Sequence, residues 1–150
     1  MSETVRVVDE AQTRELRRAV LRPHLAPGAP MPGDDLAGGV HLGAFDDDGT
    51  VLGTCFVYPD PCPWLPDRDG AWRLRQMATA EGQRGRGIGA AVLEAAIAYV
   101  REQGAALVWC NARERAVPFY GRHGLRTYGD IFIDEHHQIP HQRMWRELSA

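Results

Sequence analysis

The sequence predicts an α/β or α+β fold in which helices lie on the faces of a mixed β-sheet. Two observations predict this class. Short β-branched or apolar runs, bounded by glycine and proline, alternate with segments whose apolar residues recur at helical spacing. One segment, 87–103, is apolar around most of a helical circumference, and such a helix must be buried against a sheet. The length of 150 residues, with 44% hydrophobic and 25% charged residues, fits one globular domain.

Composition and charge exclude several classes of partner. The net charge of -3 gives no reason to expect nucleic acid. No apolar run approaches the roughly 20 residues that span a bilayer, and residues 1–10 lack the apolar core of a signal peptide. The odd number of cysteines, Cys55, Cys62 and Cys110, predicts no disulfide framework. We therefore expect a cytoplasmic protein with no nucleic-acid or membrane partner.

The first elements are a strand and a helix. Three of the four residues in 5–8 are β-branched, which favours a strand. Asp9 offers a helix N-cap and Gln12 a capping-box partner, and apolar residues at helical spacing extend the helix to about Leu21. Residues 22–39 are rich in proline and glycine and predict a surface loop.

A hairpin and a third strand follow. Segments 40–45 and 51–58 flank Asp46-Asp47-Asp48-Gly49, a sequence typical of a hairpin turn. Four prolines within 59–69 predict another loop. Apolar residues alternate loosely through 71–79, which we interpret as a strand.

The second half begins with the clearest helix. Gly104 closes the 87–103 helix in the position after its C-cap. Residues 105–110 form a short apolar run without alternation, which predicts a strand in the middle of the sheet. A shorter helix is expected at 113–122, where Pro118 marks either a kink or the true start. The last two expected strands are 125–133 and 141–148.

The most informative motif is Arg84-Gly85-Arg86-Gly87-Ile88-Gly89, between the 71–79 strand and the buried helix. The first backbone N–H groups of a helix have no intrahelical partner, and the helix dipole adds partial positive charge. Glycines let the backbone approach a ligand, and the two arginines supply charge. These features together predict a pyrophosphate site. The alternative is a tight turn that needs glycine for its geometry alone.

Other phosphate-binding motifs fit less well. Gly85-x-Gly87-x-x-Ala90 also satisfies the dinucleotide fingerprint, which requires an acidic residue about 20 positions later, at the end of the next strand. That strand is expected to end at Trp109-Cys110-Asn111, without an acid. A Walker A loop requires a lysine, and the sequence has none. A dinucleotide-binding protein is therefore the less favoured alternative.

These residues resemble the GCN5-related N-acetyltransferases, the GNAT family. The family motif R/Q-x-x-G-x-G/A is matched by Arg84-x-x-Gly87-x-Gly89, and a second block is matched by Phe119-Tyr120 followed by His123-Gly124-Leu125. The tail from Gly129 to Met144, with Ile139-Pro140-His141, is similar to the ElaA/YjcF-like branch. Two departures are Leu125, where the family commonly has an aromatic residue, and the absence of Val-x-Pro near Thr79.

The resemblance implies a fold and an activity. The fold is a mixed, mostly antiparallel sheet of about seven strands with helices on both faces, in one domain covering 1–150. The activity is direct transfer of an acetyl group from acetyl-CoA to a primary amine of a small molecule or peptide. The cosubstrate would lie between the fourth and fifth strands, and a homodimer is compatible with this family. The implied cofactor-binding residues are Met77, Ala78, Thr79, Arg84, Gly85, Arg86, Gly87, Gly89, Ala90 and Asn111.

Tyr120 matches the family tyrosine that protonates the sulfur of coenzyme A, although an aromatic residue beside Phe119 also fits plain packing. The sequence does not identify the base that removes the amine proton. The candidates are a water chain and five side chains. These are His41, Glu81, Asp130, Glu135 and His141.

Metal and thiol chemistry are not expected. His136, His137 and His141 lack a convincing metal spacing with a carboxylate, so we predict no metal. Cys110 lies in an apolar strand, which favours a buried structural thiol over a nucleophile. A non-catalytic module that binds coenzyme A remains the alternative to an enzyme.

Overall fold

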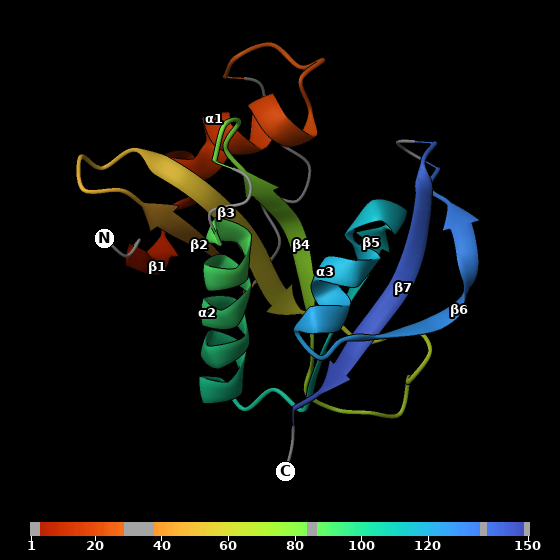
Figure 1. The fold of residues 1–150 in the computed structure, drawn as a ribbon. Helices are drawn as coiled ribbons and strands as arrows, with labels where there is room; N and C mark the ends of the chain where they lie inside the picture. The colour runs from red at the N-terminus through yellow and green to blue at the C-terminus, as the bar shows by residue number, and fades with distance from the viewer. Residues whose placement is uncertain (1–3, 29–37, 84–86, 136–137, 149–150) are drawn as a thin grey trace. The chain divides into compact units, whose positions relative to one another are not determined.

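The computed structural model describes residues 4–28, 38–83, 87–135 and 138–148. Within them the chain forms seven strands, three α-helices and one short 3-10 helix (Figure 1). The elements are β1 (Thr4–Val8), α1 (Glu10–Leu21), β2 (Val40–Phe45), β3 (Val51–Pro59), β4 (Ala71–Thr79), α2 (Ile88–Glu102), β5 (Leu107–Arg113), the 3-10 helix (Glu114–Ala116), α3 (Val117–Arg122), β6 (Arg126–Ile133) and β7 (Pro140–Glu147).

The strands form one sheet in the order β1-β2-β3-β4-β5-β7-β6. β4 and β5 are parallel, whereas the pairs β1–β2, β2–β3, β5–β7 and β6–β7 are antiparallel. A seven-stranded mixed sheet with helices confirms the predicted fold class.

Two compact units divide the described chain. The first comprises residues 1–58 and 74–99, and the second comprises 59–73 and 100–150. β4 and α2 each contribute residues to both units. A single domain covering the whole chain therefore stays a prediction.

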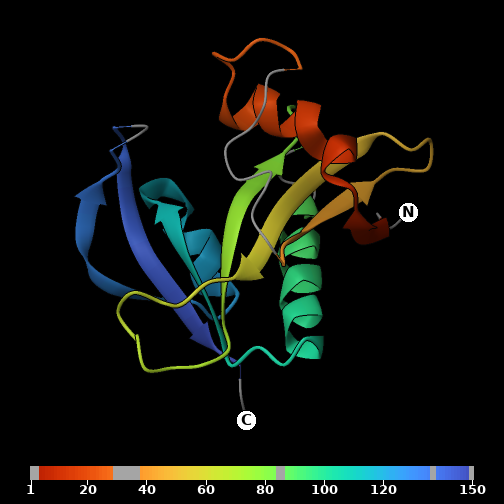
Figure 2. The same ribbon diagram turned by 180° about the vertical axis from the view of Figure 1, so that it is seen from behind.

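In the first unit, α1 and α2 lie on opposite faces of the sheet. A Cβ added to Gly53 of β3 would meet Ile88 of α2 at 2.7 Å. The next residue along β3, Thr54, points to the other face, and its β2 partner Gly43 lies beneath Thr13 of α1. The two views show α2 in front of these strands in Figure 1 and α1 in front of them in Figure 2.

The core of the second unit gathers around β5. Trp109 and Leu107 of β5 pack with Cys62 and Ala71 in a buried cluster, against which Trp64 is partly buried. The indole Nε1 of Trp109 donates a hydrogen bond to the carbonyl of Asp60 at 2.9 Å. Burial of these side chains therefore holds the proline-rich loop that precedes β4, although the loop has no regular structure.

The expected boundaries of β5 were wrong. The strand was predicted at 105–110 but runs from Leu107 to Arg113. Ala105 instead completes the end of α2, because its N–H bonds the Val100 carbonyl at 2.9 Å. At the other end, Asn111, Ala112 and Arg113 pair with β7. Sheet pairing thus extends the strand beyond its apolar run, into residues that carry no hydrophobic signal.

The helix expected at 113–122 was also wrong in its first part. α3 begins at Val117, with Pro118 in its first turn, and the three preceding residues form the 3-10 helix. Proline lacks the N–H that a helix interior requires, so it is tolerated at a helix start. Pro118 therefore marks the true start of the helix rather than a kink.

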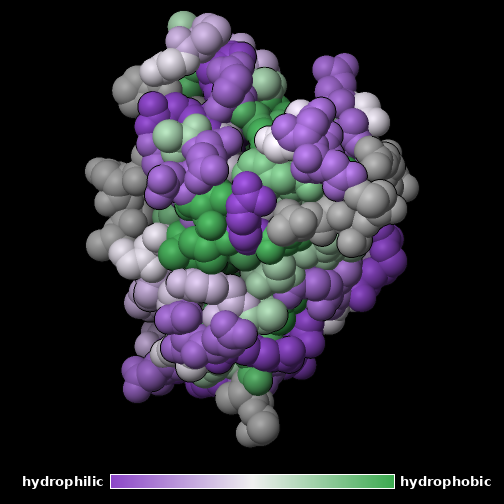
Figure 3. All heavy atoms as spheres, turned by 90° about the vertical axis from the view of Figure 1, so that its left-hand side faces the viewer, coloured by the Kyte–Doolittle hydropathy of each residue, from purple (hydrophilic) through white to green (hydrophobic). Residues whose placement is uncertain are grey.

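One side of the molecule exposes apolar surface between hydrophilic side chains (Figure 3). The edge strands of the sheet are β1 and β6. In the described parts of the chain, the exposed large apolar residues are Val7 on β1 and Tyr128, Ile131 and Ile133 on β6.

Within the described residues, no helix has the length and apolar character needed to cross a membrane.

Candidate functional site

The start of α2 has the geometry expected of an anion site. Gly87 has φ of 80°, in the left-handed region that favours glycine, and a Cβ added there would meet no atom within 4 Å. Its carbonyl accepts a hydrogen bond from Ala91 N at 3.0 Å, so the helical ladder begins at Gly87. The amides of Ile88, Gly89 and Ala90 therefore form the first turn, where helix N–H groups and the dipole attract anions. The predicted contributors Arg84, Gly85 and Arg86 lie outside the described residues.

The first turn of α2 is fixed against β3. Ile88 is 1% exposed. Because glycine has no side chain, Cγ2 of Ile88 can occupy the space beside Gly53. Val92, one turn later, is fully buried and also lies near Gly53. A glycine inside a strand often marks such a close approach. Gly53 in the mainly apolar segment 51–58 is the sequence signal for this contact.

The predicted cofactor edge on β4 has mixed burial. Ala78 is 3% exposed, whereas the side chains of Met77 and Thr79 are partly buried. Just before them, Gln76 has φ of 58°, although it lies inside a strand and is not glycine. A left-handed conformation costs an L-residue about 1–2 kcal/mol.

A buried arginine contacts Gln76. Arg17 of α1 is fully buried, and its Nη1 donates to Gln76 Oε1 at 3.1 Å. Its Nε donates to Thr13 Oγ1 at 3.1 Å, and its Nη2 donates to the Glu10 carbonyl at 2.8 Å and to Glu10 Oε2 at 2.9 Å. This cluster could not be predicted from the sequence, because an arginine in a helix with polar neighbours normally indicates a solvent-exposed face.

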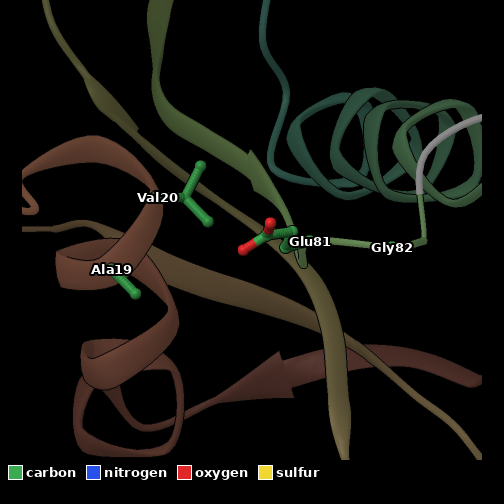
Figure 4. Close-up of a pocket in the computed structure, with 4 residues that line it drawn as sticks. All are labelled: Ala19, Val20, Glu81 and Gly82. Carbon is green, nitrogen blue, oxygen red and sulfur yellow. The ribbon is translucent and has the colours of Figure 1, made fainter.

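A pocket of about 370 Å³ lies beside the end of β4. It is lined by Ala19 and Val20 of α1 and by Glu81 and Gly82, which follow β4 (Figure 4). The carboxylate of Glu81 points toward α1 in this view. Glu81 is therefore placed to face a ligand in this pocket, and a carboxylate there attracts a cationic group.

Tyr120 and Asn111 belong to the second unit. Tyr120 on α3 is 6% exposed, and its ring meets Phe119 edge-on at a centroid distance of 5.1 Å. This geometry agrees with the packing alternative and leaves the role as an acid a prediction. Asn111 has an exposed side chain on β5, opposite Arg143 of β7. With β5 continuing to Arg113, the strand still contains no acidic residue of the kind that a dinucleotide site requires.

The two candidate histidines are both buried. His41 on β2 is 5% exposed and lies 4.5 Å from the ring of Phe56. His141 on β7 is 7% exposed, and its Nδ1 lies 2.9 Å from the carbonyl oxygen of Ile139. A carbonyl oxygen only accepts hydrogen bonds, so this contact places the proton of neutral His141 on Nδ1 and its basic lone pair on Nε2.

The three candidate carboxylates are all exposed. They are Glu81, Asp130 and Glu135. Burial therefore does not single out any of them as the general base.

The cysteines are buried thiols. Cys55 and Cys110 are 0% and 2% exposed, and burial raises the pKa of each thiol to about 12. Burial also raises the pKa of Cys62. A nucleophilic cysteine requires a thiolate, which a raised pKa disfavours. The expectation that Cys110 is a buried thiol is therefore confirmed.

The native protein should react slowly with an aromatic disulfide reagent at pH 8, because its buried thiols remain protonated. All three cysteines should react after unfolding in guanidinium. The absorbance of the released thiol measures the reaction of the native protein and that of the unfolded protein. Rapid reaction of a native cysteine at stoichiometric reagent would contradict the assignment of these thiols to the core.

Within the part of the chain that the structure describes, no group of three or more histidine, cysteine, aspartate or glutamate side chains is placed to hold a metal ion. His136 and His137, considered in the sequence analysis, lie outside that part.

Comparison with known proteins identifies the family. The profile of the acetyltransferase (GNAT) family matches residues 9–125. YitI of Bacillus subtilis (strain 168), described as an uncharacterised N-acetyltransferase, is 34% identical over 129 residues, or 85% of each chain. YjcF of the same organism, also described as an uncharacterised N-acetyltransferase, is 31% identical over 81 residues, covering 53% of this chain and 56% of YjcF.

A solved structure agrees at the level of the fold. An aminoglycoside 6'-N-acetyltransferase complexed with coenzyme A superposes with a TM-score of 0.77 at 12% identity, covering 98% of each chain. The family profile spans both the β4–α2 turn and Tyr120. The family profile covers most of the chain and YitI is 34% identical over 85% of it, so this chain belongs to the GNAT acetyltransferases.

Proposed function

We propose that the protein is an N-acetyltransferase that moves the acetyl group of acetyl-CoA directly to a primary amine of a small molecule or peptide. The observation that carries this proposal is the start of α2. Gly87 is left-handed and open on its Cβ side, and it leads into the first turn of a helix whose N-terminal half is buried against β3. Backbone N–H groups in that setting suit a pyrophosphate. Membership of the GNAT family supports coenzyme A as its carrier.

Each predicted residue has a role in this proposal. The amides of Gly85, Gly87, Gly89 and Ala90, with Arg84 and Arg86, would hold the pyrophosphate. The backbone of Met77–Thr79 would pair with the pantetheine arm, and Asn111 would contact the cosubstrate from β5. Small side chains at Gly89 and Ala90 fit this role, because they let a ligand approach the first turn of the helix.

The chemistry requires a neutral amine, a polarised carbonyl and a proton for the leaving sulfur. Acetyl-CoA supplies the acetyl group as a thioester. A backbone N–H of β4 would donate to the acetyl oxygen, and the Tyr120 hydroxyl would give its proton to the departing thiolate. A base must accept the proton that the amine loses when its nitrogen bonds to the acetyl carbon.

The pocket at Glu81 supports a cationic acceptor. Its carboxylate faces the space beside α1, where it would attract the ammonium form of an amine (Figure 4). Ala19 and Val20 line the same space with apolar atoms, so an amine on a partly apolar carbon skeleton fits it better than a highly charged one.

The test is an amine panel. Purified protein is incubated with acetyl-CoA and primary amines that include an aminoglycoside, a polyamine and short peptides. We expect release of the coenzyme A thiol together with an amine that has gained the mass of one acetyl group. The N,N-dimethyl analogue of the accepted amine is the matched control, because a tertiary amine has no N–H to lose and forms no stable amide.

The outcomes separate the competing functions. Thiol release without an acetylated amine would indicate thioester hydrolysis. Binding of coenzyme A without thiol release across the panel would favour a non-catalytic module. Binding of a nicotinamide dinucleotide in place of coenzyme A would favour the dinucleotide alternative and contradict the proposal.

A further inference from the structure

We propose that Arg17 is a positioning residue, which holds Gln76 in its left-handed conformation and thereby sets the direction of the β4 peptide groups that receive the cosubstrate. The inference rests on the proposed function, since it concerns the same β4 edge. It adds a residue from α1, and the site described above includes no role for that part of the helix.

The conformation of Gln76 needs an external cause. Among the described residues, Gln76 and Gln138 are the two non-glycine residues with positive φ, at 58° and 57°. Gln138 lies in the connection between β6 and β7, whereas Gln76 lies inside β4. Glutamine has no local hydrogen bond of the kind that lets asparagine or aspartate occupy this region. Such conformations persist where the surrounding structure determines them, and they cluster at functional sites.

Arg17 is held rigidly enough to provide that cause. Thr13, one helical turn earlier, is itself fully buried and accepts from Nε, while Glu10 accepts twice from Nη2. A guanidinium is planar, with its N–H groups in fixed directions. Fixing Nε and Nη2 on α1 therefore also fixes Nη1, which donates to the Gln76 side chain at 3.1 Å.

The peptide groups after Gln76 have little freedom of their own. At the far end of this stretch, Ala80 N donates to the Leu52 carbonyl of β3 at 2.8 Å. Hydrogen bonds thus hold the chain at Gln76, through Arg17 of α1, and at Ala80, through Leu52 of β3. A change in φ at Gln76 must be absorbed by the residues between them, Met77, Ala78 and Thr79. Those are the residues whose backbone would pair with the pantetheine arm and polarise the acetyl carbonyl.

Two variants at one position separate conformation from contact. Gln76→Gly and Gln76→Val both remove the amide that Arg17 contacts, but glycine adopts positive φ freely and a β-branched residue does not. We expect Gln76→Val to weaken coenzyme A binding by about tenfold and to lower kcat by about 10²-fold, the loss that a small misplacement produces. We expect Gln76→Gly to stay within about threefold of the wild type in both quantities. In free energy, a threefold change is less than half of a tenfold change.

Arg17 is tested through rescue. Arg17→Met removes the donors and keeps an unbranched side chain, and it should weaken binding by about tenfold. Adding Gln76→Gly to Arg17→Met should recover most of that loss, because glycine adopts a positive φ without a contact from the arginine. Gln138→Val is the control for strain: it places a β-branched residue at the other positive φ, between β6 and β7, so it should lower the unfolding midpoint and leave binding unchanged.

Calorimetric titration with coenzyme A and steady-state kinetics measure every variant, and circular dichroism confirms folding. Equal effects of glycine and valine at position 76 would overturn the inference while leaving the proposed function intact. If Arg17→Met does not fold, Arg17→Lys takes its place in the rescue test, because lysine keeps the charge without the planar set of donors. A wild-type protein that neither binds coenzyme A nor transfers acetyl would overturn the proposed function and the inference together.

Discussion

Replacing Tyr120 with phenylalanine is expected to lower kcat by about 10²- to 10⁴-fold, the range for removal of a positioned acid. The substitution removes the hydroxyl that would protonate the leaving thiolate and keeps the ring. That ring is 6% exposed and packs edge-on against Phe119, so the core around α3 should be preserved. Binding of acetyl-CoA should change little. Steady-state kinetics with the best acceptor of the amine panel, together with calorimetry, measure the two effects separately.

Tyr58→Phe is the matched control for this substitution. Tyr58 on β3 is 7% exposed, so its replacement also removes a buried phenol, but it has no role in the proposed chemistry. Its kcat should stay near that of the wild type. A rise in KM without a change in kcat for the Tyr120 variant would instead indicate lost uniform binding. Wild-type turnover of that variant, with chemistry shown to be rate-limiting, would remove Tyr120 from the mechanism.

Gly87→Val should weaken acetyl-CoA binding at least about tenfold, or roughly 1.4 kcal/mol. The sequence suggested a steric reason, that a side chain would occupy the phosphate position. The structure adds a conformational one: φ of 80° is strained for any β-branched residue, so the turn must move and carry the first amides of α2 with it. Calorimetric titration of the folded variant measures the loss.

The other end of the same helix supplies a control for strain. Gly104 has φ of 86°, and a Cβ added there also meets no atom within 4 Å. Gly104→Val should therefore cost a similar amount of stability in thermal unfolding, about 1–2 kcal/mol. It lies after the C-terminus of α2 and should leave acetyl-CoA affinity unchanged. Equal affinity losses in the two variants would show that the effect at Gly87 is general destabilisation.

Most elements of the fold could be predicted, because each carries a local signal. The predicted pairing of Asp9 and Gln12 at the start of α1 is confirmed, since Gln12 Oε1 accepts a hydrogen bond from Asp9 N at 3.0 Å. The acidic hairpin turn and the strand at Ala71–Thr79 lie as expected. β5 could not be bounded from the sequence, because pairing with β7 rather than hydrophobicity determines where it ends.

The candidate site was only partly predictable. The glycine motif identified the start of α2, because left-handed residues and close approaches require glycine. Nothing comparable marks Gln76, whose side chain contacts Arg17, 59 positions away in sequence. Arg17 was missed for the same reason: its burial depends on tertiary partners, and its residue type predicts exposure.

Binding of acetyl-CoA to the wild-type protein tests the central claim most directly. The account predicts saturable binding at a single site in a calorimetric titration. That binding should be displaced by coenzyme A but not by a nicotinamide dinucleotide, and it should weaken with salt because the pyrophosphate is held by charge and backbone dipoles. Absence of binding by folded protein, or equal competition by the dinucleotide, would contradict the account.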